Sequence, residues 1–318
     1  MAYQAGDTIL DDEYNTFVNS SSDPYGYNHF AGPGSGEYGL NQSTISTVSA
    51  GDTIAASNWN ALFTGLDNIA NHTNTSITAS SVSAGDTIAI RSALITDLAN
   101  LAAAVAGGST GATALDSPTS VGSSTNAATW NGTSTIERSV TFANNNTMRA
   151  FFNAGGFIRI DPSCITGIDG DKDTVFNDLT VTATGNLDLK AQSTTRSGSG
   201  ETLTTNGLAN GFHDLGTSYT TLLKLTSDNS GYTSNTVEYS AKLDAAVNSA
   251  TVLTIKMVSV DADNDDTYTS PNTSGVPANP NEAPRMTLAL LASNPNDTEG
   301  LAADITSASN AEVSNSTS

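Results

Sequence analysis

The chain of 318 residues contains one cysteine, Cys164, so no disulfide can form within it. Small secreted domains without a large core depend on several such bonds, and this class of protein is therefore excluded. The sequence also lacks an uninterrupted apolar run of about 18 residues, the length that a membrane-spanning helix needs. We therefore expect no insertion into a membrane.

Basic residues are scarce: 11 Lys and Arg stand against 32 Asp and Glu, which gives a formal net charge of −21. A surface that binds nucleic acid needs positive charge to neutralise phosphates, so nucleic acid is not an expected partner. Charged residues make up only 14% of the chain, which is not the composition of a disordered acidic tail. The polar content is mostly Ser, Thr, Asn and Gly, which favours short strands joined by polar turns.

Residue patterns that carry out catalysis are equally rare. The three histidines, His29, His72 and His213, lie far apart, and none has a partner at the spacing of zinc ligands. The sequence contains no nucleophile elbow of the Gly-x-Ser-x-Gly type and no phosphate-binding loop with lysine. Cys164 follows a predicted turn, and we interpret it as a buried, unreactive thiol. We therefore predict a protein that is not an enzyme, with no catalytic residues and no organic cofactor.

Two acidic clusters, residues 169–173 and 261–266, place aspartates at alternate positions. Alternating carboxylates in a loop can converge on Ca²⁺, which takes about six to eight oxygen ligands. Neither cluster has the glutamate that closes an EF-hand loop, and a lysine within the first cluster competes with a cation. Solvated turns are the favoured interpretation, and the second cluster supplies the candidate Ca²⁺ ligands Asp261, Asp263 and Asp265.

The most prominent feature that is present is the phrase Ala-Gly-Asp-Thr-Ile, which occurs at residues 5–9, 50–54 and 84–88. Gly supplies a turn, Asp can cap its own backbone, and Thr-Ile favours a short extended piece. Self-similarity of this kind is the signature of a repeat architecture. We predict that each copy opens one unit of strand plus helix.

An amphipathic helical pattern follows each copy of the phrase. Tyr14-Asn15 stands after the first copy where Trp59-Asn60 stands after the second, and the third copy is the most divergent. One unit alone buries too little apolar surface, so we predict that the units of residues 1–106 share one core as an α+β repeat domain, which anchors the protein. In the second unit, five apolar residues fall on one helix face: Trp59, Leu62, Phe63, Leu66 and Ile69.

A Gly- and Tyr-rich insertion, residues 24–39, interrupts the first unit. Such a composition favours a loop, and Tyr suits interfaces because its ring is apolar and its tip is polar. Packing of the loop on its own domain and docking to a neighbouring subunit are both open alternatives. The candidate partner-interface residues are Tyr25, Tyr27, Phe30 and Tyr38.

Residues 107–127 are rich in Gly, Ser, Thr and Ala without periodicity, and we predict a linker there. From residue 128 onward the apolar period changes to two, which is typical of strands. We predict a mainly-β antiparallel sandwich over residues 128–292 and a polar C-terminal tail over residues 293–318. The expected sandwich core residues are Phe142, Phe152, Ile158, Ile160, Leu223, Leu225, Val252 and Ile255.

Local signals refine this domain. Residues 147–154 and 173–179 are predicted to form short helices, and Gly155 or Gly156 should end the first with a positive φ. Residues 180–184 are predicted to form a strand. The apolar run of residues 286–291 is predicted to form an edge strand that closes the sheet.

The opening phrase with Tyr14-Asn15, the Gly-rich loop that ends in Tyr38-Gly39, and the second phrase with Trp59 resemble a family of virion structural proteins of marine tailed bacteriophages. Two further stretches are similar to the β domain of the same proteins. These are Arg-Ala-Phe-Phe-Asn-Ala-Gly-Gly-Phe-Ile-Arg-Ile at residues 149–160, and residues 211–219. The resemblance covers residues 3–260, apart from the divergent third copy.

The resemblance implies a non-enzymatic structural component on the exterior of the virion, assembled in the host cytoplasm. A tail fibre, collar or tail-associated fibre protein is the leading form. A capsid decoration or head-fibre protein is the first alternative, and a host-glycan-binding or carbohydrate-active protein is the second. The implied partners are other virion proteins of the tail, collar or capsid and further copies of the chain, a trimer by analogy with fibres.

Overall fold

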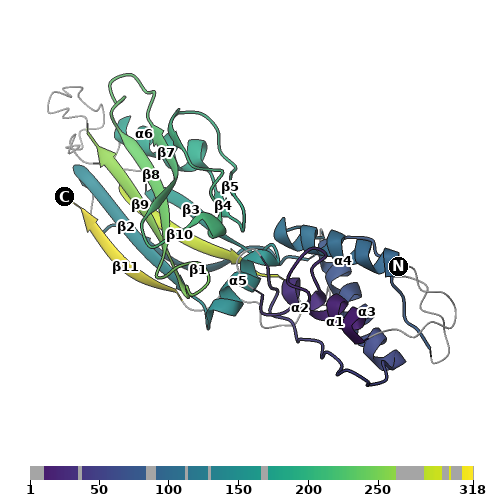
Figure 1. Cartoon of the computed structure of the whole chain (residues 1–318). Coiled ribbons are helices and arrows are strands. Elements are labelled where there is room, and N and C mark those ends of the chain that lie inside the picture. Colours follow the sequence, from purple (N-terminus) through teal and green to yellow (C-terminus); the bar gives the residue numbers. More distant parts are fainter. Residues whose placement is uncertain are drawn as a thin grey trace. The chain divides into compact units, whose positions relative to one another are not determined.

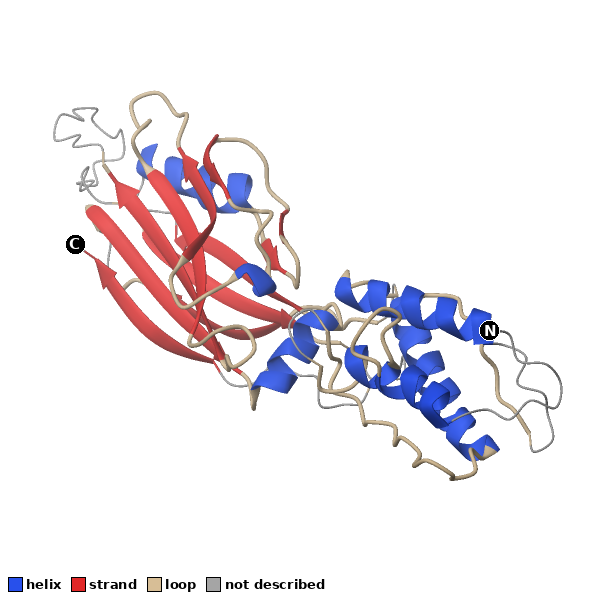
Figure 2. Ribbon diagram, in the orientation of Figure 1, coloured by secondary structure: helices blue, strands red, loops and turns tan. Residues whose placement is uncertain are grey.

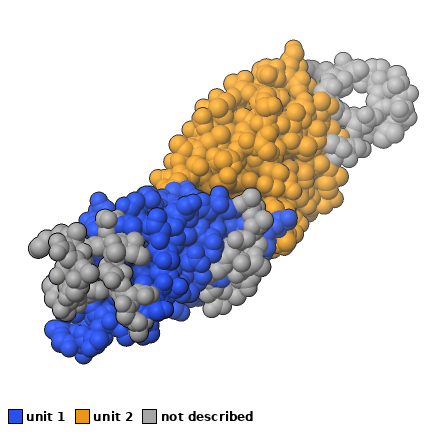
Figure 3. Space-filling view, turned by 90° about the vertical axis from the view of Figure 1, so that its right-hand side faces the viewer, with its two compact units in different colours: residues 1–117, 143–156, 294–306 blue, residues 118–142, 157–293, 307–318 orange. Residues whose placement is uncertain are grey.

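The computed structural model describes residues 11–34, 38–83, 91–111, 114–127, 130–165, 171–262, 283–295, 301 and 310–317. The chain forms two compact units, which Figure 3 distinguishes by colour. Unit 1 comprises residues 1–117, 143–156 and 294–306, and unit 2 comprises residues 118–142, 157–293 and 307–318. The chain therefore passes between the units five times, after residues 117, 142, 156, 293 and 306.

Unit 1 is helical, as Figure 2 shows by colour. The helices α1, α3 and α4 each follow one copy of the sequence phrase, but the first and third copies lie outside the described residues. In the second copy, Gly51 has a φ of +89°, and Thr53 and Ile54 lead into α3 without joining a strand. The helices are α1 (Asp11–Asn19), α2 (Tyr27–Phe30), α3 (Ala56–Thr73), α4 (Arg91–Ala106) and α5 (Asn145–Asn153) (Figure 1).

Aromatic side chains form the core between α1 and α3. The ring centroid of Trp59 lies 5.3 Å from that of Tyr14, 6.0 Å from that of Phe17 and 5.8 Å from that of Phe63. The predicted α3 stripe is confirmed, because all five of its residues are buried. Leu98 of α4 is also buried, so the apolar faces predicted from the 3.6-residue period are the faces that pack.

Helix α5 lies between the strands β2 (Gly132–Thr141) and β3 (Phe157–Ile165) in sequence but belongs to unit 1. The prediction that Phe152 lies in the sandwich core is therefore wrong, because Phe152 is part of this helix. Phe152 is fully buried, and so are the polar side chains of Arg149 and Asn153 on the same helix. A helix buried on its polar side as well as its apolar side needs hydrogen-bonding partners, and unit 1 supplies them. Gly155 has a φ of +83°, so the predicted helix end is confirmed.

Unit 2 contains two sheets in which every strand pair is antiparallel, an arrangement consistent with the expected sandwich (Figures 1 and 2). The five-stranded sheet has the order β1 (Thr119–Thr125), β10 (Arg285–Ser293), β3 (Phe157–Ile165), β4 (Leu187–Leu189), β5 (Thr194–Arg196). The six-stranded sheet has the order β11 (Asn310–Thr317), β2 (Gly132–Thr141), β9 (Val252–Asp261), β8 (Thr236–Leu243), β7 (Thr220–Thr226), β6 (Thr202–Asn206).

Two segments that the sequence marked as irregular are edge strands. Part of the predicted linker is β1, and part of the predicted polar tail is β11. An edge strand is held by backbone hydrogen bonds and needs few apolar side chains, so its composition resembles that of a linker. Three edge strands carry a register irregularity, at Val121 in β1, at Thr204 in β6 and at Val313 in β11.

Two further predictions for unit 2 are wrong. The run of residues 286–291 is a strand, β10, but it lies inside the sheet between β1 and β3 and not at an edge. Residues 180–184 are not a strand but the end of a π-helix, η1 (Asp178–Thr184), which continues α6 (Asp171–Asn177). The hydroxyl of Thr180 donates to the carbonyl of Phe176 at 2.6 Å, so a β-branched residue is accommodated in the helix by bonding back to it.

The predicted core of unit 2 is otherwise confirmed. Phe142 and the other predicted residues within this unit are buried, apart from Val252, which is partly exposed as the first residue of β9. None of the helices in the described part of the chain combines the length and apolar character that a membrane crossing requires.

Replacement of Trp59 by alanine should lower the free energy of unfolding by about 3–5 kcal/mol, the range for a buried large aromatic side chain. The indole N–H of Trp59 is buried and has no hydrogen-bond partner among the described residues. Trp59→Phe removes that N–H and keeps a ring, so it should cost much less. Chemical denaturation monitored by circular dichroism measures both values, and equal losses would contradict this view of the core.

Candidate functional site

Of the three candidate calcium ligands, Asp261 lies in the described part of the chain. The carboxylate of Asp261 accepts a hydrogen bond from Lys172 Nζ at 2.7 Å, so a lysine neutralises the charge that a cation would need. Asp263 and Asp265 lie outside the described residues. Within those residues, no three His, Cys, Asp or Glu side chains come together to hold a metal ion.

Two of the four candidate interface residues, all of which belong to unit 1, are buried. Tyr27 is 5% exposed and Phe30 is fully buried, so they contribute to the core and not to an interface. Burial raises the pKa of Tyr27 to about 12. The sequence did not reveal this, because a Gly-rich segment was expected to be a loop, whereas these two residues begin and end the short helix α2.

The other two candidates form a partly exposed ring cluster, which comprises Tyr25, His29 and Tyr38. The rings of Tyr25 and His29 stack at 4.4 Å with an interplanar angle of 9°. The ring of Tyr38 lies 4.8 Å from that of Tyr25 and 4.6 Å from that of His29. Partial burial lowers the pKa of His29, so the uncharged imidazole is favoured within the stack. The ring cluster can therefore offer apolar ring surface to a neighbour.

Side chains from α5 hold the backbone beside the ring cluster. The guanidinium of Arg149 donates to the carbonyl of Tyr38 at 3.2 Å and to that of Pro33 at 2.7 Å. Asn153 Nδ2 donates to the carbonyl of Gly39 at 3.0 Å. Burial lowers the pKa of Arg149, and its hydrogen bonds compensate for part of the desolvation of the guanidinium. The backbone at and beside Tyr38 of the ring cluster is thus held by a helix that lies over 100 residues further along the chain.

Asparagine side chains clamp two extended segments that join no sheet. Asn15 Nδ2 donates to the carbonyl of Val48 at 2.8 Å, and its Oδ1 accepts from the Val48 amide at 2.9 Å. Asn60 makes the same pair of bonds with Val82, at 2.9 and 2.8 Å. Val48 and Val82 each stand two residues before a copy of the Ala-Gly-Asp phrase. The Asn15–Val48 pair of hydrogen bonds and the Asn60–Val82 pair therefore occupy equivalent positions in the sequence.

A second polar side chain holds each segment three residues earlier. Asn28 makes paired hydrogen bonds with the backbone of Ile45, both at 2.8 Å. Asp97 accepts from the amide of Ala79 at 2.8 Å and from that of Thr78 at 3.0 Å. These side chains satisfy backbone groups that would otherwise depend on water. The alignment of Asn15 with Asn60 was the sequence signal for the clamps, but the sequence alone assigned these residues no role.

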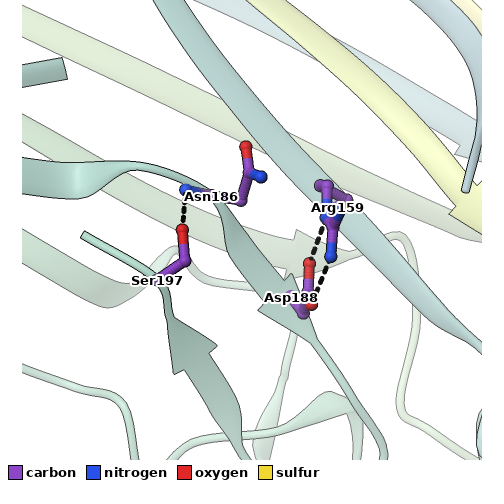
Figure 4. Close-up of polar contacts among 4 residues, drawn as sticks. All are labelled: Arg159, Asn186, Asp188 and Ser197. Carbon is purple, nitrogen blue, oxygen red and sulfur yellow. Dashed lines mark hydrogen bonds and ion pairs between the residues drawn. The ribbon is translucent and has the colours of Figure 1, made fainter. Parts of the chain in front are cut away.

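One acid of unit 2, Asp188, also has a structural partner. Arg159 and Asp188 face one another across β3 and β4, with Nε–Oδ1 and Nη2–Oδ2 distances of 2.7 and 2.9 Å (Figure 4). The hydrogen bond to Asp188 raises the pKa of Arg159. The bidentate pair of Arg159 and Asp188 fixes the acid in the sheet. In the same view the backbone amide of Asn186 donates to Ser197 Oγ at 2.7 Å.

The histidines and the thiol occupy structural positions. His72 is buried, and its Nε2 lies 2.8 Å from the carbonyl oxygen of Ala154. His213 lies in a short 3₁₀ helix, Phe212–Asp214. Cys164 lies in strand β3 and not in a turn, and burial, aided by the charge of Asp173, raises the pKa of its thiol to about 11. A thiol with that pKa is protonated at neutral pH and is a poor nucleophile.

Comparison of the chain with protein-family models, with curated proteins and with solved structures returned no match.

Replacement of Asn60 by alanine should destabilise unit 1 by about 1–3 kcal/mol, because the amide and carbonyl of Val82 lose their partners together. Asn71→Ala is the matched control, since Asn71 lies exposed near the end of the same helix and should change stability by less than about 0.5 kcal/mol. Hydrogen exchange should show faster exchange of the Val82 amide in the first variant only. An unchanged rate at Val82 would contradict the role of the clamp.

Proposed function

We propose that the chain is a non-enzymatic structural component of a tailed-phage virion, with a tail fibre, collar or tail-associated fibre protein as the leading form. The observation that carries the proposal is that several polar residues have structural roles. The side chains of Asn15, Asn60 and Arg149 hold backbone segments. The carboxylates of Asp188 and Asp261 are each paired with an arginine or lysine side chain. These side chains stabilise the molecule, as a component of a particle requires.

Unit 1 is proposed as the repeat-built anchor. The equivalent clamps on Val48 and Val82 support a common plan for successive units, because the same side chain holds the same sequence position each time. The third copy has Leu94 where the first two have Asn15 and Asn60. Lack of the clamping side chain suits the last unit of a series, since no further segment follows for it to hold.

Unit 2 is proposed as the part that projects outward or joins neighbours. Three edge strands, β1, β6 and β11, carry register irregularities at Val121, Thr204 and Val313. Bulges in edge strands are one way in which proteins protect exposed edges against uncontrolled pairing with other sheets. This protection and the net charge of −21 suit a protein whose copies stand close to one another on a particle.

The ring cluster is proposed as part of the contact with a further copy of the chain or with another virion protein. Tyr25 and Tyr38 present apolar rings on a backbone that α5 holds in place, and rigid aromatic residues of this kind dominate many interfaces. Aromatic rings also stack on sugars, so the same cluster keeps the glycan-binding alternative open. A capsid decoration or head-fibre protein remains the other alternative.

Gold-labelled antibodies against the purified chain should bind intact particles at the tail or collar, in a low copy number set by the symmetry there. Labelling of the head, with on the order of hundreds of copies, would favour the decoration alternative. Absence of the chain from purified particles, judged by mass spectrometry, would refute the proposal.

The double variant Tyr25→Ala/Tyr38→Ala should be monomeric where the parent chain is oligomeric, because the rings are removed while Tyr27 and Phe30 stay in the core. Analytical ultracentrifugation measures the change. Leu203→Ala is the control, since Leu203 is 43% exposed on β6 in unit 2. An unchanged oligomer in the double variant, with the fold intact by circular dichroism, would show that the ring cluster is not the interface. Loss of binding to host glycans by an oligomer that is otherwise unchanged would support the glycan alternative.

A further inference from the structure

A lysine and an aspartate meet inside unit 2 at hydrogen-bond distance. Lys172 on α6 lies 89 residues from Asp261 at the end of β9, and Nζ and Oδ2 are 2.7 Å apart. The side chain of Lys172 is 5% exposed and that of Asp261 is fully buried. A second lysine pair, between Lys224 and Glu238, is longer at 3.3 Å, and both side chains are about a third exposed, at 32% and 29%.

Two aromatic residues stand close to this pair along the chain and in strand register. Phe176 follows Lys172 by one turn on the same face of α6. Its ring meets that of Trp130 edge to face, with the centroids 5.2 Å apart, and both rings are buried. Asp261 is the register partner of Gly132, two residues after Trp130. The exposed fractions of 5% for Lys172 and 0% for Asp261 show that the ion pair itself is shielded from bulk water.

Burial changes the chemistry of such a pair. Two opposite charges in a dry site have lost their hydration, which their mutual attraction repays only in part. Transfer of one proton from the ammonium to the carboxylate gives a neutral amine and a carboxylic acid, and a low-dielectric environment favours these forms. A neutral amine is a nucleophile. The hydroxyl group of a protonated carboxyl can take up a proton from the attacking amine and leave as water.

We propose that Lys172 and Asp261 condense to form an isopeptide bond within the chain. The Nζ atom attacks the Asp261 carboxyl carbon, and one carboxyl oxygen then leaves as water. The ammonium brings three hydrogens: two leave with that oxygen and one stays on the amide nitrogen. Atoms and charge therefore balance without an oxidant, a cofactor or a second substrate.

The arrangement of the pair suits this reaction. A hydrogen bond from Nζ to Oδ2 places the nitrogen roughly 3–3.5 Å from the carboxyl carbon, the separation of a near-attack conformer. Because the protein holds both groups in place, the entropy cost of bringing them together is met by folding. The bond fastens α6 to β9 and restricts the unfolded chain as a long-range disulfide does. The single cysteine excludes a disulfide, so this pair supplies a covalent link by other means.

The proposal is independent of the function proposed above and is tested on the full chain. Intact-mass spectrometry of the folded and then denatured protein should give a mass lower than that of the sequence by one water molecule. Lys172→Arg keeps the charge but provides no amine for this condensation, so it should show its full mass. Lys224→Arg is the matched control and should show the same deficit as the parent chain.

Digestion with trypsin locates the bond and does not depend on the variants folding. The linked parent chain should release one branched peptide that joins residues 160–190 to residues 257–285, because trypsin does not cut after an acylated lysine. The linked chain should also migrate faster than the Lys172→Arg variant in a denaturing gel. A parent mass equal to that of the sequence, with separate peptides cut after Lys172, would show a plain ion pair and overturn the proposal.

Discussion

Backbone groups outside regular secondary structure need partners, and in unit 1 this requirement is met by a few polar side chains. The segments around Val48 and Val82 run without sheet neighbours, yet each is fixed at two points by side chains from two helices. The helices depend on these bonds in turn, because a short helix is stable only when its faces are packed. The same logic places Arg149 and Asn153 under the loop that carries the ring cluster. Polar side chains here connect the helices to the loop segments by hydrogen bonds, while Trp59 and its aromatic neighbours supply the apolar contacts.

Periodic features of the sequence predicted the structure well. The stripe around Trp59 is local, so the 3.6-residue period alone identifies the buried face. The apolar run of residues 286–291 likewise identified the strand β10, and the Gly-Gly pair identified the end of α5. Whether a strand is internal or at an edge depends on its neighbours, however, and the apolar run carried no information about β1, which pairs with β10.

The errors arose where distant residues decide the outcome. Asp261 was grouped with nearby aspartates, but its partner is Lys172, 89 residues away. Tyr27 and Phe30 were assigned to a surface because their segment is Gly-rich, but a short helix turns both into the core. Polar edge strands such as β1 cannot be distinguished from linkers by composition, since backbone pairing leaves no mark on the side chains. The contacts of the candidate interface were therefore less predictable than the fold of either unit.

The division of unit 1 into separate stretches of sequence affects the order in which the protein can be made. Translation delivers α1 to α4 first, but the helix that holds the loop at Tyr38 and Gly39 is encoded only at residues 145–153. Domains usually fold as units while the chain emerges at about 5–20 residues per second. Unit 1 cannot finish in that way, because strands β1 and β2 leave the ribosome before α5 does. The nascent chain therefore carries an incomplete helical unit for some seconds, and its apolar faces stay exposed to water during that time.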